Sequence, residues 1–178
     1  MSNIPITLKE IYVPIRIWLE NNIINFASNT DISQITDNIF VGNISTGTNL
    51  ELLKKMGITH IVSALSHFTA PFPDDFNYYH ISIYDVEESN IGIHFLQCNH
   101  FIHNAIKNNG KVYIHCMCGV SRSITLTIAY LMTQRDNTVQ ELLEFIRTKR
   151  PIANPNPGFI KQLEEFYRNF SKLDRLLF

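Results

Sequence analysis

Residues 115–123 read His-Cys-Met-Cys-Gly-Val-Ser-Arg-Ser, which sets a thiol and a guanidinium at the two ends of a short loop that contains glycine. A β-type run at 111–115 precedes the loop, and residues 121–134 follow it with the apolar spacing of a helix. Backbone N–H groups of such a loop converge at a helix N-terminus, where partial positive charge and unpaired donors favour an anion. The segment therefore predicts a phosphate-binding loop.

The two ends of this loop carry complementary chemistry for phosphoryl transfer. A helix N-terminus and a nearby Arg favour the thiolate of Cys116, which would then be a nucleophile. Arg122 supplies a planar, charged fork that can bind two phosphoryl oxygens. The loop amides would hold the remaining charge; they belong to Met117, Cys118, Gly119, Val120, Ser121 and Arg122. This layout predicts a covalent thiophosphoryl intermediate.

Three further residues are expected to support this chemistry. Gly119 lacks a Cβ, which permits unusual dihedral angles and a close approach of the backbone to a ligand. Ser123 can donate a hydrogen bond to the sulfur when the sulfur becomes the leaving group. His115, at the end of the preceding strand, is expected to orient the loop rather than to titrate during catalysis.

The loop resembles the active-site signature of the cysteine-based protein tyrosine phosphatases, and its closing Arg-Ser is similar to their dual-specificity branch. The resemblance covers about residues 32–170. The other segments that carry it are 39–43, 56–62, 129–132, 150–151 and 155–159. It implies hydrolysis of phosphotyrosine, phosphoserine and phosphothreonine in a shallow pocket, with phosphoproteins as substrates.

A proton donor for the leaving oxygen should lie on a separate loop that reaches over the phosphate. Asp85 is the expected general acid, because it follows a strand-like run at 79–83 and opens a polar stretch at 85–90. Its spacing from Cys116 is similar to the family's acid-to-cysteine spacing. Turn-rich sequence surrounds Asp74 and Asp75, while Glu87 and Glu88 are expected to be solvated or to face the substrate.

Two positions have alternative interpretations. Asn156 matches the Asn of the family's Pro-Asn-x-Gly-Phe element, which by resemblance would brace the phosphate loop, but Asn between two prolines is equally ordinary turn chemistry. Cys118 stands where the family more commonly has a small residue such as Ala, and we expect it to be a buried small hydrophobe. The alternative is a redox partner for Cys116, although their close spacing disfavours a relaxed disulfide.

The residues do not indicate a metal or other cofactor. His115, Cys116 and Cys118 are possible metal ligands, but the sequence offers no second pair of ligands, which a structural zinc site needs. His94, His100 and His103 fall on one expected helical segment with only one i,i+3 pair among them. We expect neither a metal site nor a cofactor.

Composition limits the class of protein and its partners. A chain of 178 residues with 45% hydrophobic content suits one globular domain. A net charge of −1 and the lack of a Lys/Arg run argue against nucleic-acid and membrane partners. Three cysteines suit a reducing compartment, so we expect a cytoplasmic protein, with nuclear entry left open.

The chain divides at about residue 30. Residues 1–30 form an extension with apolar residues on one helical face, interrupted by Pro14. Packing on the same domain is the first expectation for this extension, homodimer formation the second and membrane-surface binding the third. Residues 31–178 form the expected catalytic domain.

The expected fold class is α/β, with a central, mostly parallel sheet of four to five strands flanked by helices. Strands are expected near 39–41, 60–64, 78–83 and 111–115. Thr138 is an expected N-cap, and Phe159, Leu163, Phe166 and Phe170 mark a final helix. Chemistry at the carboxyl end of the strand before Cys116 agrees with the rule for open sheets.

Phosphomonoester hydrolysis by a dual-specificity protein phosphatase is the leading functional hypothesis. A second hypothesis keeps the chemistry but changes the substrate to an RNA 5′ phosphate or a phosphoinositide, which the neutral loop residues disfavour. A third is a noncatalytic phosphoprotein-binding module. The presence of Cys116, Arg122 and Asp85 argues against that third hypothesis.

Overall fold

A computed structural model describes residues 31–170, which fold around a five-stranded sheet. The strand order is β1-β2-β5-β3-β4, and only the pairing of β1 with β2 is antiparallel. The strands are β1 (Ile32–Gln34), β2 (Ile39–Gly42), β3 (His60–Ala64), β4 (Asn77–Ile81) and β5 (Val112–His115). The expected α/β class with a mostly parallel sheet is confirmed.

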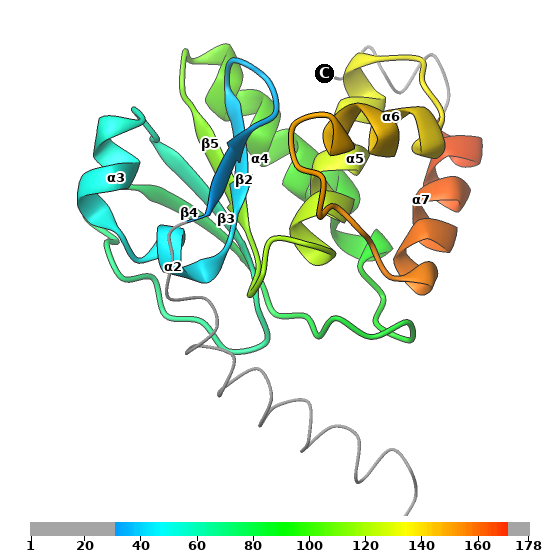
Figure 1. Cartoon of the computed structure of the whole chain (residues 1–178), viewed down its shortest axis with the longest axis horizontal. Coiled ribbons are helices and arrows are strands. Elements are labelled where there is room, and N and C mark those ends of the chain that lie inside the picture. The colour runs from blue at the N-terminus through cyan, green and yellow to red at the C-terminus, as the bar shows by residue number, and fades with distance from the viewer. Residues whose placement is uncertain (1–30, 171–178) are drawn as a thin grey trace, which may run out of the picture.

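Helices cover both faces of this sheet (Figure 1), and the strand residues alternate between the two layers. Val112 and Ile114 of β5 face the larger core, which is shared with the helices at residues 95–107, 122–134, 139–147 and 157–169. Tyr113 of the same strand faces the smaller core, which contains Leu53 of the helix at residues 50–55. The central strand is therefore buried on both sides, which holds the loop that follows it at a defined position.

Residues in the sequence explain where two of the helices, those at residues 139–147 and 157–169, begin. Their bounds are α2 (Ile44–Gly47), α3 (Leu50–Lys55), the 3₁₀ helix η2 (Gly92–His94), α4 (Phe95–Lys107), α5 (Arg122–Gln134), α6 (Val139–Arg147) and α7 (Pro157–Asn169). Thr138 caps α6 in a capping box with Glu141. Asn156 caps α7, whose first residue is a proline.

The strand expected near 78–83 corresponds to β4, but β4 spans Asn77–Ile81 and ends two residues earlier than expected. Among the described residues β4 pairs only with β3, whose last residue Ala64 lies opposite Ile81, so the ladder ends at that point. Ile83 instead offers its carbonyl oxygen to the Arg122 guanidinium, 3.1 Å away. The short strand β1 was not expected, and Phe170 follows α7 as its C-cap.

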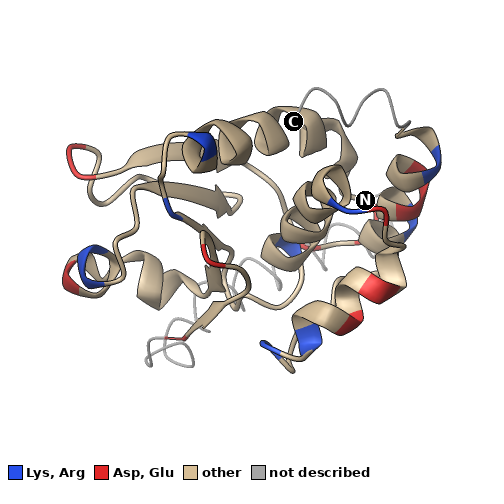
Figure 2. Ribbon diagram, turned by 90° about the horizontal axis from the view of Figure 1, so that it is seen from above, with Lys and Arg blue, Asp and Glu red and all other residues tan. Residues whose placement is uncertain are grey.

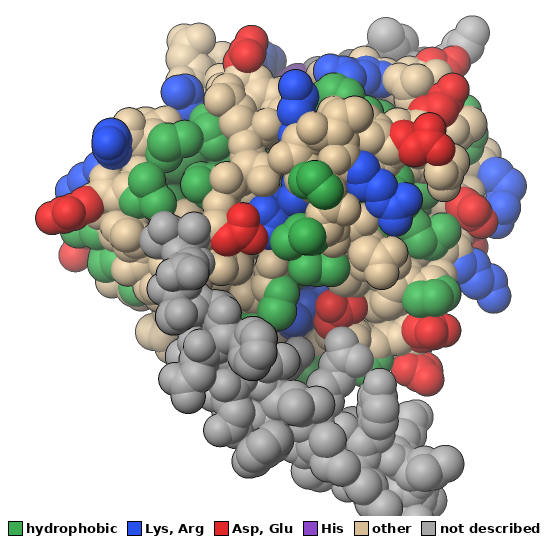
Figure 3. Space-filling model, viewed as in Figure 1, with side chains coloured by type: hydrophobic (Ala, Val, Ile, Leu, Met, Phe, Trp, Pro, Cys, Tyr) green, Lys and Arg blue, Asp and Glu red, His purple; other side chains and the backbone are tan. Residues whose placement is uncertain are grey.

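The surface has no dominant charge. Positive and negative residues are interspersed along the described elements (Figure 2), and the face in Figure 3 mixes both signs with hydrophobic side chains. Among the described residues, no helix has the length and apolar character needed to cross a bilayer. The expected extension at residues 1–30 lies outside the described residues, so its dimerisation stays a prediction.

Candidate active site

The loop between β5 and α5 is held from outside by its carbonyl oxygens. Donors from distant segments bind four of them: Ile44 N to Met117 O at 3.2 Å, Arg150 Nη2 to Cys118 O at 3.2 Å, Arg150 Nε to Gly119 O at 2.7 Å, and Asn154 N to Val120 O at 2.8 Å. All peptide bonds of the described residues are trans. In a trans peptide the N–H points away from the C=O. The N–H groups that follow these carbonyls therefore turn toward the loop interior, as an oxyanion requires.

Arg150 is the centre of this arrangement. Its side chain is fully buried, and its guanidinium bridges the loop carbonyls to the carboxylate of Asp31 and to Ser33 Oγ. The planar guanidinium can bind the loop carbonyls and the Asp31 carboxylate at the same time, which a lysine ammonium cannot do. Arg150 appeared in the sequence only as part of an Arg-Pro pair, and Asp31 carried no signal, so sequence reasoning missed this brace.

Gly119 adopts a left-handed conformation with φ +68°. A Cβ at this position would lie 2.5 Å from Gly42 O and 2.6 Å from Arg150 Nη2. Both the dihedral angle and the close approach to β2 require glycine here.

Cys116 lies at the floor of the loop and is only 1% exposed. Burial by itself would raise the pKa of its thiol, but the Arg122 guanidinium and hydrogen bonds from Ser123 outweigh burial, so the pKa lies below the usual value. The sulfur is 3.4 Å from Ser123 Oγ. Cys98 is also fully buried, and there burial alone acts on the thiol and raises its pKa strongly. Cys116 therefore ionises more readily than a free thiol, and Cys98 less readily.

His115 is neutral and held in place. Burial lowers its pKa to about 4, and the Arg122 charge acts in the same direction. Its Nε2 lies 2.6 Å from Ser63 Oγ, and its ring stacks on Tyr113 at a centroid distance of 5.4 Å. A buried ring with these contacts does not change its charge near neutral pH. This geometry suits orientation of the loop.

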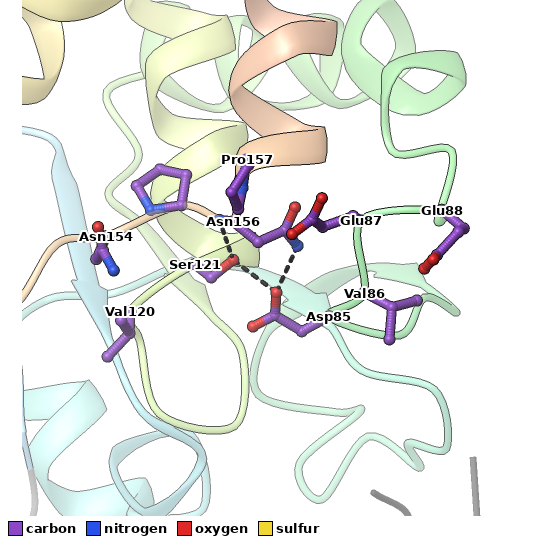
Figure 4. A pocket seen from close by; sticks show the side chains of 10 residues that line it. Asp85, Val86, Glu87, Glu88, Val120, Ser121, Asn154, Asn156 and Pro157 are labelled. Atoms are coloured by element: carbon purple, nitrogen blue, oxygen red, sulfur yellow. Dashed lines mark hydrogen bonds between the residues drawn. The ribbon is translucent and has the colours of Figure 1, made fainter. Parts of the chain in front are cut away.

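Asp85 reaches the loop from the segment after β4 (Figure 4). Its Oδ1 accepts hydrogen bonds from Ser121 Oγ at 2.6 Å and from Asn156 Nδ2 at 2.8 Å. Its Oδ2 lies 3.9 Å from the Nε of Arg122. Ser121, the N-cap residue of α5, makes no side-chain cap hydrogen bond, since its hydroxyl is directed to Asp85. The first N–H groups of α5 thus stay available to an anion rather than to a side-chain cap.

A cavity of about 530 Å³ opens above these residues. Loop residues Val120 and Ser121 line it together with Asp85 and Asn156. Its lining, as far as the described residues form it, does not include the buried residues Cys116, Arg122, Ser123 and His115. A volume of this size suits a ligand group, and the lining brings the loop and Asp85 to one opening.

The expectation that Cys118 is a buried hydrophobe is wrong, because its side chain is exposed. The reason is the direction of the loop backbone: the Cys118 carbonyl points out of the loop to Arg150, and the side chain faces solvent. Within the described part of the chain, no group of three or more His, Cys, Asp and Glu side chains could hold a metal ion.

Comparisons with known proteins agree with the geometry. The family model described as the dual specificity phosphatase catalytic domain matches residues 39–169. The chain is similar to dual specificity protein phosphatase 1B of Arabidopsis thaliana, with 37% identity over 78% of this chain and 83% of that protein. Identity to dual specificity protein phosphatase 15 of Rattus norvegicus is 43%, over 82% of this chain and 62% of that protein.

Two solved structures are similar in fold and sequence. The crystal structure of DUSP15 has a TM-score of 0.77 at 37% identity and covers 82% of this chain and 93% of that chain. The human tyrosine phosphatase-like serine/threonine/tyrosine-interacting protein has a TM-score of 0.75 at 29% identity, over 78% of this chain and 97% of that chain.

Arg150→Lys should weaken the loop brace. The lysine keeps the charge but cannot bind Asp31 and two loop carbonyls together, so we expect unfolding free energy to fall by about 3 kcal/mol. Inorganic phosphate should also bind more weakly. Urea denaturation and phosphate titration measure the two effects. Arg168→Lys, at an exposed position of α7, should change stability by no more than about 0.5 kcal/mol. Unaltered phosphate affinity in Arg150→Lys would contradict the role of the brace.

Ser123→Ala should raise the pKa of Cys116. The hydroxyl hydrogen bond lowers that pKa, so its loss should move the acidic limb of thiolate reactivity up by about one pH unit. Alkylation by iodoacetamide as a function of pH, with Cys116 identified by peptide mapping, measures this shift. Ser82→Ala, at an exposed serine, is the control. An acidic limb that stays in place in Ser123→Ala would show that the hydroxyl does not stabilise the thiolate.

Proposed function

This chain belongs to the dual specificity phosphatase family and is a protein phosphatase, and we propose that Cys116, Arg122 and Asp85 carry out its reaction. The observation that supports the proposal most is the buried sulfur of Cys116, whose pKa is lowered by Arg122 and Ser123 against the effect of burial. Such a thiolate, at the floor of a ring of amide groups, can attack a phosphorus atom bound in the loop.

In the first step the sulfur forms a bond to phosphorus while the bond from phosphorus to the leaving oxygen breaks. Arg122 and the loop amides hold the nonbridging phosphoryl oxygens and stabilise the charge that they carry. Asp85, in its acid form, gives a proton to the leaving oxygen of the tyrosine, serine or threonine side chain. The product is a cysteinyl phosphate and a free protein hydroxyl.

In the second step Asp85, now a carboxylate, takes a proton from a water molecule. That water attacks phosphorus, the bond between sulfur and phosphorus breaks, and inorganic phosphate leaves. The Ser123 hydroxyl, 3.4 Å from the sulfur, stabilises the departing thiolate by a hydrogen bond. Asn156 holds the Asp85 carboxylate, and His115 orients the loop, so both act as positioning residues.

The proposed substrates are phosphoproteins with phosphotyrosine, phosphoserine or phosphothreonine. The cavity supports protein substrates over phosphoinositides, because among the described residues that line it none is Lys or Arg. A cytoplasmic location and a homodimer formed through residues 1–30 are further parts of this proposal. Gel filtration of the full chain against a variant that lacks residues 1–30 tests the dimer.

Cys116→Ser and Asp85→Asn test the assigned roles separately. Cys116→Ser should abolish turnover of an aryl phosphate while inorganic phosphate still binds, because the loop amides remain. Asp85→Asn should lower kcat about 10²- to 10⁴-fold on phosphoserine peptides, whose leaving group needs a proton. Phosphate release and phosphate titration measure these effects.

Asp74→Asn is the control for charge, because Asp74 is an exposed aspartate away from the cavity. Its kcat should match that of the unmodified chain. Normal turnover by Cys116→Ser would contradict the assignment of Cys116 as nucleophile, and a normal kcat in Asp85→Asn would contradict the assignment of Asp85 as general acid.

A further inference from the structure

One wall of the cavity beside the loop at 116–122 is acidic. Glu87 and Glu88 both line the cavity of about 530 Å³. Figure 4 shows them on the segment that continues from Asp85, while Val120 and Asn154 lie on the opposite side. Beside the loop, the cavity therefore has a negatively charged wall on one side and an uncharged wall on the other.

This acidic wall is fixed before any substrate binds. The backbone of Glu87 packs so closely on Gly158 that a Cβ there would lie 2.2 Å from Glu87 O. Gln162 Nε2 donates to Ser89 O at 2.9 Å, and Gln162 Oε1 accepts from Gly92 N at 2.8 Å. The segment is thus attached to α7 at both ends. Because its backbone is already ordered, binding does not carry the cost of ordering it.

Within residues 31–170, the two carboxylates have no ion-pair partner. In the residues that the structure describes, neither Glu87 nor Glu88 forms an ion pair or a side-chain hydrogen bond. Arg147, behind the opposite wall, donates to Ala153 O at 2.9 Å and to Asn154 Oδ1 at 3.4 Å. Both glutamates are exposed, so they can attract a cationic group that approaches from solution.

The acidic wall lies within reach of residues that flank the phosphorylated position. Asp85 is hydrogen-bonded to the loop at 2.6 Å, and the Cα of Glu87, two residues on, is within about 7.6 Å of the Asp85 Cα. Residues next to a phosphorylated side chain in an extended peptide are separated by about 3.8 Å per residue. Long basic side chains at these positions can therefore approach Glu87 and Glu88.

From this arrangement we propose that Glu87 and Glu88 select phosphoproteins with Lys or Arg within about two residues of the phosphorylated side chain. The inference rests on the proposed function, because it concerns the substrates of the same site. The same carboxylates repel substrates with acidic or additional phosphorylated groups nearby, since like charges placed together disfavour binding.

Three phosphopeptides test the inference. They share one phosphorylated residue and one length and differ only in their flanking residues, which are Arg, Gln or Glu. At low salt, kcat/KM should be about 3- to 10-fold higher for the Arg peptide than for the Gln peptide, the scale of one or two exposed ion pairs. The preference should shrink at 1 M salt, where such charges are screened.

Glutamate variants assign the preference to the wall. In Glu87→Gln/Glu88→Gln the ratio of kcat/KM between the Arg and Gln peptides should fall toward one. In Glu87→Lys/Glu88→Lys the Glu peptide should become the better substrate. The control is Glu164→Gln/Glu165→Gln, which removes two adjacent exposed glutamates of α7 outside this cavity and should keep the ratio of the unmodified chain.

The outcomes separate this inference from the proposed function. Equal kcat/KM for the three peptides, or an unchanged ratio in Glu87→Gln/Glu88→Gln, would overturn the selection by charge and leave the phosphatase assignment intact. Turnover of an aryl phosphate without hydrolysis of any of the peptides would overturn both. Faster hydrolysis of a phosphoinositide or of a 5′-phosphorylated RNA than of every peptide would also overturn both.

Discussion

The direction of the peptide groups in residues 117–120 is the constraint on which the proposed active site depends. An isolated loop would leave its carbonyl oxygens and N–H groups free to turn either way. Here the carbonyls of four successive residues are bound by donors from two other parts of the chain, residue 44 and residues 150–154, so the N–H groups that follow them turn toward the loop interior. The positive potential at Cys116 is therefore a product of tertiary structure as much as of the helix N-terminus.

Electrostatic effects around Cys116 act in opposite directions. Burial raises the pKa of the thiol and the Asp85 carboxylate raises it further, whereas Arg122 and Ser123 lower it. The net effect favours the thiolate, although Cys116 is fully buried. The same water exclusion that opposes ionisation also strengthens the interactions of Arg122 and the amides with phosphate. In the proposed mechanism, the reactivity of the sulfur and the binding of the phosphoryl group would both depend on this one arrangement.

The local sequence pattern predicted many of the helices and strands of this protein. The strands near 60–64 and 111–115, a helix from residue 121 and the helix capped by Thr138 were all predicted from periodicity and local capping, and the structure contains them. The brace between Asp31 and Arg150 could not be predicted in this way, because the two residues are 119 positions apart and pair only in the folded chain. Exposure of Cys118 was also unpredictable, since it depends on which way one peptide unit is turned.

The wide sequence separation of the loop's partners also governs when the site can form during folding. Contacts between residues 31 and 150, 44 and 117, and 85 and 156 close long segments of chain, which makes them costly in entropy and late relative to local helices. A polypeptide still emerging from the ribosome contains the proposed nucleophile, Cys116, long before the proposed phosphate site can form around it. Under the proposed mechanism, catalytic activity is therefore gained only when the tertiary structure is complete, so a measurement of phosphatase activity also measures complete folding.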